Sequence, residues 1–142
     1  MYDRILIPTD GSENAEAAME HALDIATLHG AELHVLHVIN TRRYDTSIES
    51  QVAPLRRKGS QYIERLVEQA AETSVSLTTA MELGTPAATI LEYAGEHDVD
   101  IVVIGTRGHG GLARRLLGST TRYVVANADV PVFVVPPGAG RS

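Results

Sequence analysis

The sequence RILIPTDGS at residues 4–12 decides the fold class of this chain. Its first half is a short apolar run, which is typical of a strand buried on both faces of a parallel sheet. The Asp-Gly pair that follows is typical of a tight turn. Ser12 is a favoured helix N-cap, small apolar residues follow it at helical spacing, and Gly30 is the kind of residue that ends a helix. This stretch therefore predicts a strand, a turn and a helix in immediate succession.

The same alternation of strand and helix continues to the end of the chain. Apolar and β-branched runs predict further strands at residues 31–39, 74–83, 100–104 and 130–135. Apolar residues at helical spacing predict helices at 52–73, from Pro86 onward with Thr85 as the cap, and at 119–127. The polar stretch at 40–51 has no clear period and is interpreted as a mobile loop.

This order of elements defines the fold class. Strands that alternate with helices imply a parallel sheet joined by right-handed crossovers. We therefore predict a single-domain α/β protein of the Rossmann-like kind, with a five-stranded parallel sheet in the order 3-2-1-4-5 and helices on both faces. The domain is expected to span residues 1–136, with a flexible Pro/Gly-rich tail at 137–142.

Composition excludes several classes of protein. The chain has 142 residues, 44% of them hydrophobic, and a net charge of −6, which argues against non-specific binding of nucleic acid. It has no cysteine, so it is neither a disulfide scaffold nor a thiolate metal protein. No apolar run reaches the roughly 18 residues of a transmembrane helix, and no signal peptide fits the start. We expect a cytoplasmic protein that binds neither nucleic acid nor membrane.

A ligand site is expected where the winding of the sheet reverses. In open parallel sheets, ligands bind beyond the carboxyl ends of the strands at this switch point. Because the chain starts in the middle of its sheet, the strands at 4–8 and 100–104 are predicted neighbours across it. Their carboxyl ends carry the two sequences that look most like sites, TDGS at 9–12 and the glycine-rich loop that starts at Gly105.

The loop GTRGHGGLARRLLGST at residues 105–120 has the composition of an anion site. Glycine allows the backbone to approach an anion closely, and successive amides can form an anion-binding nest. Gly118, Ser119 and Thr120 open a helix whose free amides and dipole favour phosphate. A glycine-rich turn capped by Ser119, without a ligand, is the alternative interpretation.

Two better-known phosphate motifs do not explain this loop. The chain has no Gly-Lys pair, so it has no P-loop. Gly108, Gly110 and Ala113 formally match a variant of the dinucleotide fingerprint, but that fingerprint belongs directly after the first strand. We interpret this match as coincidental.

With these residues in view, the sequence resembles the universal stress protein family, specifically its ATP-binding branch. That branch carries the motif G-x2-G-x9-G-[S/T], which Gly105, Gly108, Gly118 and Ser119 match. The stretches at 5–12 and 130–135 also look like the family's first and last strands. The resemblance implies a single-domain protein that usually dimerises and binds ATP.

The resemblance also implies roles for individual residues. Asp10 would lie beside the nucleotide, near the ribose or a metal on the phosphates, and the backbone of Val38 would meet the adenine edge. The full set implied to bind the cofactor is Pro8, Thr9, Asp10, Val38, Gly105, Thr106, Arg107, Gly108, His109, Gly118, Ser119 and Thr120. Because no dedicated metal ligands are evident, Mg²⁺ or Mn²⁺ would be held mainly through the phosphates. No catalytic residue is assigned.

Several of these residues have a second interpretation. Asp10 could serve only as a turn former, and His109 and Arg107 could be solvated rather than bound to phosphate, as could Arg114 and Arg115. His34 and His37 do not form a metal site, because residues three apart on a strand point to opposite faces.

The sequence also leaves more than one interpretation open for the oligomeric state and for the function. The last strand, Val130 to Val135, would be an apolar sheet edge, and antiparallel pairing of two such edges predicts a homodimer. A monomer whose edge is guarded by Pro131 and Pro136 is the alternative. The leading hypothesis is a regulatory ATP-binding module. A slow ATPase or self-phosphorylating enzyme, and a scaffolding dimer without a physiological nucleotide, are the competing ones.

Overall fold

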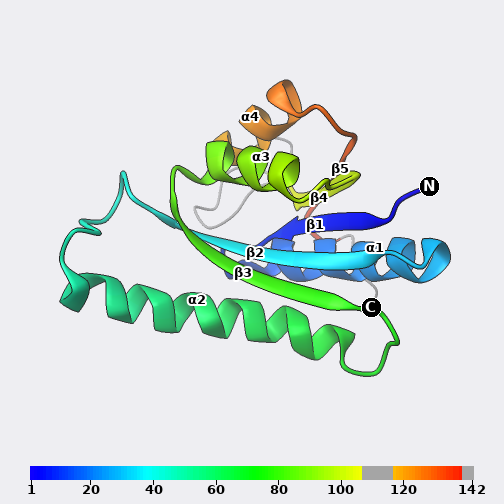
Figure 1. The fold of residues 1–142 in the computed structure, drawn as a ribbon, viewed down its shortest axis with the longest axis horizontal. Coiled ribbons are helices and arrows are strands. Elements are labelled where there is room, and N and C mark those ends of the chain that lie inside the picture. Colours follow the sequence, from blue (N-terminus) through cyan, green and yellow to red (C-terminus); the bar gives the residue numbers. More distant parts are fainter. Residues whose placement is uncertain (107–116, 139–142) are drawn as a thin grey trace.

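The computed structural model describes residues 1–106 and 117–138. Within them the elements are β1 (Arg4–Pro8), α1 (Glu13–His29), β2 (Glu32–Asn40), α2 (Glu49–Ala70), β3 (Leu77–Gly84), α3 (Pro86–Glu96), β4 (Ile101–Gly105), α4 (Ser119–Asn127) and β5 (Val132–Val135). The strands form one parallel sheet in the order β3-β2-β1-β4-β5, which confirms the predicted fold class and strand order (Figure 1).

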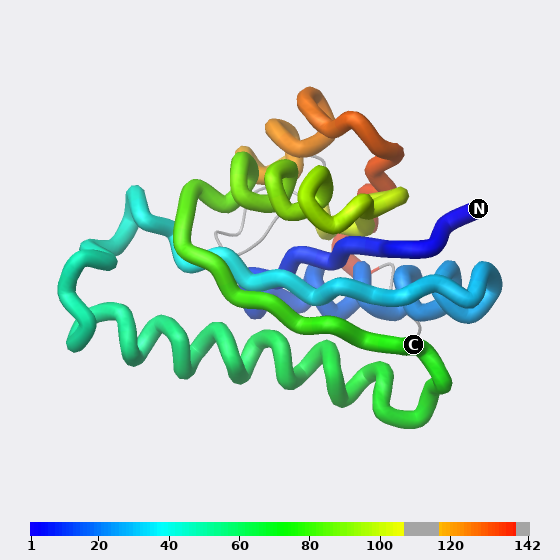
Figure 2. The backbone as a smooth tube through the Cα atoms, in the orientation of Figure 1, coloured from blue at the N-terminus to red at the C-terminus, as the bar shows by residue number. Residues whose placement is uncertain are grey.

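The helices cover both faces of this sheet. Figure 1 shows α3 and α4 on one side and α1 and α2 on the other, and the tube in Figure 2 follows α2 along β3. Each face has its own buried hydrophobic cluster. The arrangement is the three-layer sandwich that a doubly wound chain requires.

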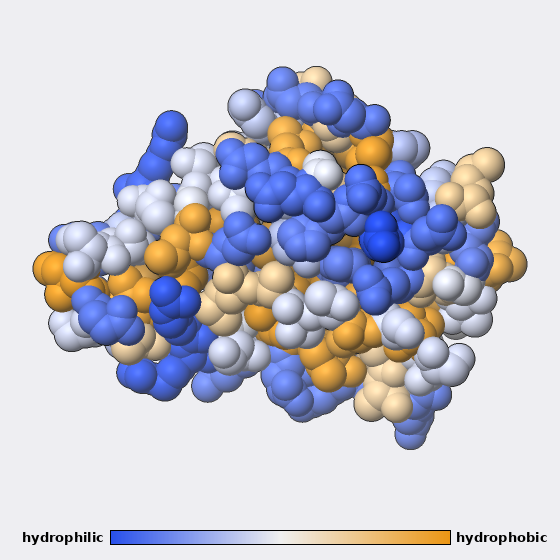
Figure 3. All heavy atoms as spheres, in the orientation of Figure 1, coloured by the Kyte–Doolittle hydropathy of each residue, from blue (hydrophilic) through white to orange (hydrophobic). Residues whose placement is uncertain are grey.

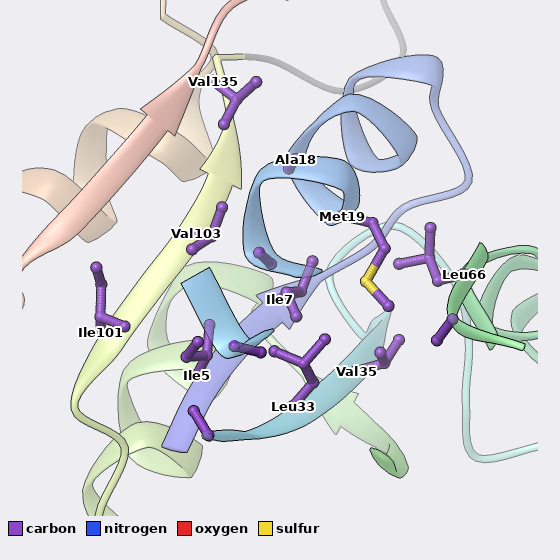
Figure 4. Packing of buried hydrophobic residues seen from close by; sticks show 14 of the residues in the cluster. Ile5, Ile7, Ala18, Met19, Leu33, Val35, Leu66, Ile101, Val103 and Val135 are labelled. Atoms are coloured by element: carbon purple, nitrogen blue, oxygen red, sulfur yellow. The ribbon is translucent and has the colours of Figure 1, made fainter. Parts of the chain in front are cut away.

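The alternation of side chains along the strands explains why both clusters form. Ile5 and Ile7 of β1 point toward α1 and α2, where they pack in one cluster with Met19 and Leu66 (Figure 4). Leu6 lies between them in sequence and points to the opposite face. A central strand of a parallel sheet is buried on both faces, so its sequence is apolar throughout.

The predicted neighbours at the switch point are also confirmed. β1 pairs with β4 through Ile5↔Ile101 and Leu6↔Val102, and with β2 on its other side. The chain leaves β1 toward α1 and β2 on one side, and returns to β4 on the other. The carboxyl ends of β1 and β4 therefore lie side by side, which is where the sequence places its candidate site.

Several predicted boundaries were wrong by a few residues. The loop at 40–51 is shorter than predicted, because α2 begins at Glu49 and ends at Ala70 rather than spanning 52–73. The first turn of α2 is polar and exposed, so apolar spacing did not reveal it. The strand predicted from residue 74 begins at Leu77.

The two predicted N-caps are correct in position only. Ser12 and Thr85 precede α1 and α3 with extended backbone, but neither side chain makes a capping hydrogen bond. Gly30 follows α1 in the left-handed conformation at φ 67°, as its sequence position predicts. Asp10 performs a capping-like role instead, because its Oδ1 accepts a 3.0 Å bond from the amide of Ser12.

The surface seen in Figure 3 is mixed, with hydrophobic residues in separate patches between polar ones. In the described part of the chain, no helix combines the length and apolarity needed to cross a bilayer. Of the predicted tail, residues 137 and 138 form a turn, and 139–142 lie outside the described residues.

Candidate functional site

A cavity of about 430 Å³ lies at the carboxyl edge of the sheet. Its walls come from the ends of β1, β2 and β4, from the first turns of α1, α3 and α4, and from the middle of α2. The predicted site residues that line it are Pro8, Thr9, Asp10, Val38, Gly105, Gly118, Ser119 and Thr120. The fold thus brings together, around one cavity, residues that are more than a hundred positions apart.

Thr106 differs from this group. Its side chain is buried and does not line the cavity, and its Oγ1 has no hydrogen-bond partner among residues 1–106 and 117–138. Its backbone is an anchor, because its amide donates to the carbonyl oxygen of Val135 at 3.0 Å and its carbonyl accepts from Gly118 at 2.7 Å. Arg107, Gly108 and His109 lie outside the described residues.

The turn at residues 9–12 forms one wall. Thr9 donates its amide to the carbonyl oxygen of Leu36 at 2.8 Å, which continues the β1–β2 pairing beyond Pro8. Thr9 Oγ1 accepts from the amide of Gly11 at 3.1 Å. These bonds, with the bond from Ser12 to Asp10, leave the Asp10 side chain exposed at the mouth of the cavity.

The N-terminus of α4 forms the opposite wall. Gly118 is its N-cap, and the first helical hydrogen bond runs from the amide of Arg122 to the carbonyl oxygen of Gly118. The amides of Ser119, Thr120 and Thr121 therefore precede the helical ladder, and the positive end of the helix dipole lies there. Ser119 and Thr120 add hydroxyl groups beside these amides, which suits an anionic ligand.

The remaining lining gives the cavity an apolar region and additional charge. Leu36, Val38, Ile39, Leu55 and Ile90 supply apolar surface. The charged side chains in the described lining are one carboxylate, Asp10, and two cations, Arg43 and Lys58. A ligand with a flat apolar part and a negatively charged part matches this combination.

Most of the wall contributed by the end of β2, by α2 and by the segment between them was not predicted from the sequence. His37, Asn40, Arg43, Tyr44, Lys58 and Tyr62 line the cavity but were not predicted as site residues. A topological signal was available, because the connection from β2 to α2 leaves the sheet at the same carboxyl edge as the predicted site. His37 and His34 face opposite sides of the sheet as predicted, since His37 contacts Tyr62 of α2 and His34 contacts Tyr93 of α3.

Among the residues that the structure describes, no three His, Asp or Glu side chains come together in a way that could hold a metal ion.

The fold and this cavity define the class of protein: a small doubly wound α/β domain with a ligand-sized cavity at its switch point. The model of the universal stress protein family matches residues 1–136, and the chain belongs to that family. Universal stress protein MJ0531 of Methanocaldococcus jannaschii is 36% identical over 140 residues, which cover 95% of this chain and 82% of that protein.

Solved structures agree with this assignment. The structure of MJ0577, described as a hypothetical protein in a test case of structural genomics, is 32% identical and covers 95% of this chain and 96% of its own, with a TM-score of 0.86. A universal stress protein solved in complex with cAMP is 24% identical and covers 94% of this chain and 97% of its own, with a TM-score of 0.76. At that identity, the second structure shows the shared fold alone.

Proposed function

We propose that this chain is an ATP-binding universal stress protein that acts as a nucleotide-dependent regulatory module in a stress response. The observation that carries the proposal is the single cavity that joins Asp10, Val38 and the N-terminus of α4. In a regulatory module, nucleotide occupancy changes the surface that a partner contacts. We place this activity in the cytoplasm.

The two walls of the cavity suit the two ends of a nucleotide. The phosphates lie at the N-terminus of α4, where Ser119 and Thr120 offer amides and hydroxyls. The adenine lies in the apolar region, with its edge at the backbone of Val38, and Asp10 stands near the ribose or a phosphate-bound metal. Arg107, Gly108 and His109 complete the phosphate side in this proposal.

The size and chemistry of the cavity support this ligand. Ligand pockets typically enclose about 300–1,000 Å³ and combine apolar walls with a few polar groups. The cavity of about 430 Å³ meets both conditions. Mg²⁺ or Mn²⁺ would enter with the phosphates and contact mainly their oxygens and water, so the protein itself needs few metal ligands.

A second candidate function is slow ATP hydrolysis or self-phosphorylation. It is favoured by the hydroxyls of Ser119 and Thr120, which line the same cavity as the Asp10 carboxylate. Binding alone requires no catalytic group, so we rank the regulatory function first. A turnover assay with γ-labelled ATP separates the two.

The proposed active form is a homodimer that pairs through β5. Among the described strands, β5 is at an edge of the sheet with β4 as its one neighbour, and Phe133 is 40% exposed. An apolar edge strand exposes backbone groups that can pair with a second chain. An antiparallel pairing about a two-fold axis uses the same residues on both copies.

The first experiment is to denature freshly purified protein and identify the released nucleotide by chromatography and mass spectrometry, with calorimetry for ATP binding. Gly118→Val tests whether the N-terminus of α4 binds the phosphates. Gly118 has φ −65° and ψ 161°, a conformation that valine adopts readily, so the variant should fold but lose binding as its side chain fills the cavity. Gly95→Ala, on an open face of α3, is the control and should bind normally. Wild-type protein that neither carries nor binds adenine nucleotide would refute the proposal.

A further inference from the structure

The turn that carries Asp10 is held by two side chains that also line the cavity, His37 of β2 and Tyr62 of α2. His37 Nδ1 lies 2.8 Å from the carbonyl oxygen of Thr9. A carbonyl oxygen only accepts, so Nδ1 carries the proton and donates it. Thr9 is thus bonded to β2 at both its amide and its carbonyl, the first through Leu36 and the second through His37.

The second contact comes from α2. Gly11 has φ +85°, in the left-handed region, and a Cβ built on it would lie only 2.4 Å from the ring of Tyr62. The aromatic ring therefore lies directly against the backbone of the turn. Tyr62 also packs edge-on against His37, with the ring centroids 5.3 Å apart and the planes at 72°. One aromatic pair thus touches the turn at Thr9 and at Gly11.

A glycine in the middle of α2 makes this close approach possible. A Cβ on Gly59 would lie 2.6 Å from Cδ2 of His37 and 2.8 Å from Cε of Met81. Glycine is unfavourable inside a helix, so its presence at a buried helical position has a packing reason here. Without it, α2 could not lie close enough to β2 for Tyr62 and His37 to meet.

We infer that Tyr62 and His37 are positioning residues that hold the Thr9–Ser12 turn, and so the Asp10 carboxylate, in the conformation that receives the nucleotide. Tyr62 and His37 affect nucleotide binding through Asp10. Because Tyr62 belongs to α2, its contact with the turn also couples the packing of α2 to nucleotide binding. This inference rests on the proposed function, because the role of Asp10 is defined by the nucleotide.

A double-mutant cycle on the full chain tests the inference. ATP affinity is measured by calorimetry for the wild type, Tyr62→Leu, Asp10→Ala and the double variant. We expect each single change to lower the affinity about tenfold. Because Tyr62 acts through Asp10, the double variant should bind about as weakly as Asp10→Ala alone. Losses that multiply in the double variant would overturn the inference, since they would mean that Tyr62 contributes independently.

A matched control and a ligand-free measurement complete the test. Tyr2→Leu removes another half-buried ring, packed edge-on against His29 far from the cavity, and should leave ATP affinity unchanged. In protein without nucleotide, backbone NMR order parameters of Gly11 and Ser12 should fall in Tyr62→Leu and stay constant in Tyr2→Leu. Unchanged order parameters in Tyr62→Leu would refute the positioning role. Wild-type protein that fails to bind ATP would refute the proposed function, whereas the NMR comparison would still decide whether Tyr62 holds the turn.

Discussion

Thr121 Oγ1 donates a 2.7 Å hydrogen bond to the carbonyl oxygen of Gly105. Thr121 lies in the first turn of α4 and is 3% exposed, and Gly105 is the last residue of β4. The bond therefore fastens the helix end that lines the cavity to the strand end that also lines it. Together with the bond from Gly118 to Thr106, it orients α4 toward the candidate ligand.

Thr121→Val is the direct test of this bond, because valine keeps the shape and removes the hydroxyl. It leaves the Gly105 carbonyl without this donor, which should lower the free energy of unfolding by about 1–3 kcal/mol. ATP affinity should fall as well, since the amides of α4 lose their fixed orientation. Urea unfolding and calorimetry measure the two effects. Thr121→Ser, which keeps the hydroxyl, is the control, and equal losses in both variants would contradict the role of the bond.

A second prediction concerns the contact between β4 and α1. A Cβ on Gly105 would lie 2.6 Å from Cβ of Asn14 and 3.2 Å from its backbone, so Gly105→Ala forces strand and helix apart. We expect a loss of about 1–3 kcal/mol in the free energy of unfolding, as for other overpacked sites. Thermal and urea unfolding measure it.

The control for Gly105→Ala is a glycine-to-alanine change that should raise the free energy of unfolding. Gly95 lies in α3, and a Cβ there meets nothing within 4 Å. Gly95→Ala should therefore stabilise the protein by about 0.5–1 kcal/mol, because alanine restricts the unfolded chain and favours the helix. If Gly105→Ala and Gly95→Ala lowered the free energy of unfolding by similar amounts, the contact with Asn14 would not be the cause of the loss in Gly105→Ala.

The elements that were predictable are those whose signal is local. β1 and β4 are apolar because both of their faces are buried, and the turn after β1 contains an Asp-Gly pair. The strand order was predicted by placing the first strand in the middle of the sheet beside the fourth, because alternation and right-handed crossovers alone allow more than one order. The first turn of α2 was missed because Glu49 and Ser50 are exposed, and Val52 is the first residue of the helix to be buried.

In the candidate site too, the predictable residues were those that belong to a local motif. Asp10 and Gly118 belong to short motifs at the ends of predicted elements, so the topology placed them together. Tyr62 and His37 carry no motif, and their relation to the turn depends on how closely α2 approaches β2. That distance is set by tertiary packing at Gly59, which no local pattern encodes.

The proposed dimer makes a prediction about the outer edge of β5. The carbonyl oxygens of Pro131 and Val135 accept bonds from β4, so alternation along the strand turns the backbone groups of Val134 to the outside. Val134→Pro removes an outward amide without removing a bond to β4. Light scattering should show a dimer for the wild type and a monomer for the variant, with matching circular dichroism. A variant that remains dimeric would place the interface elsewhere.

The last prediction concerns a polar chain on the other face of the sheet. His34 Nε2 lies 2.6 Å from Glu32 Oε1, and His34 Nδ1 lies 2.7 Å from the hydroxyl of Tyr93. A carboxylate accepts, so Nε2 carries a proton and donates it to Glu32, and the Tyr93 hydroxyl is the hydrogen-bond partner of Nδ1. His97 stacks on the Tyr93 ring at 3.8 Å. None of these residues lines the cavity.

Tyr93→Phe keeps the stacking and removes only the hydroxyl. We expect the free energy of unfolding at neutral pH to fall by about 1–3 kcal/mol, because Nδ1 of the buried His34 loses its partner. ATP affinity should not change, since the cavity is untouched. A large loss of affinity would mean that the two faces of the sheet are coupled.

The difference in free energy of unfolding between the wild type and Tyr93→Phe should also depend on pH, in a direction that the pKa of Tyr93 determines. Burial, and then the negative charges of Glu82 and Glu32, raise the pKa of Tyr93 above its ordinary value of 10.0. Folding therefore favours the neutral phenol, and this stabilisation is complete below pH 10 and is lost as pH rises through the raised pKa. As pH rises above 10, the free energy of unfolding of the wild type should fall relative to that of Tyr93→Phe, because the Tyr93 phenol loses its proton at lower pH in the unfolded chain than in the folded one. Urea unfolding at stepped pH measures the difference, and parallel curves would show that Tyr93 titrates alike in both states.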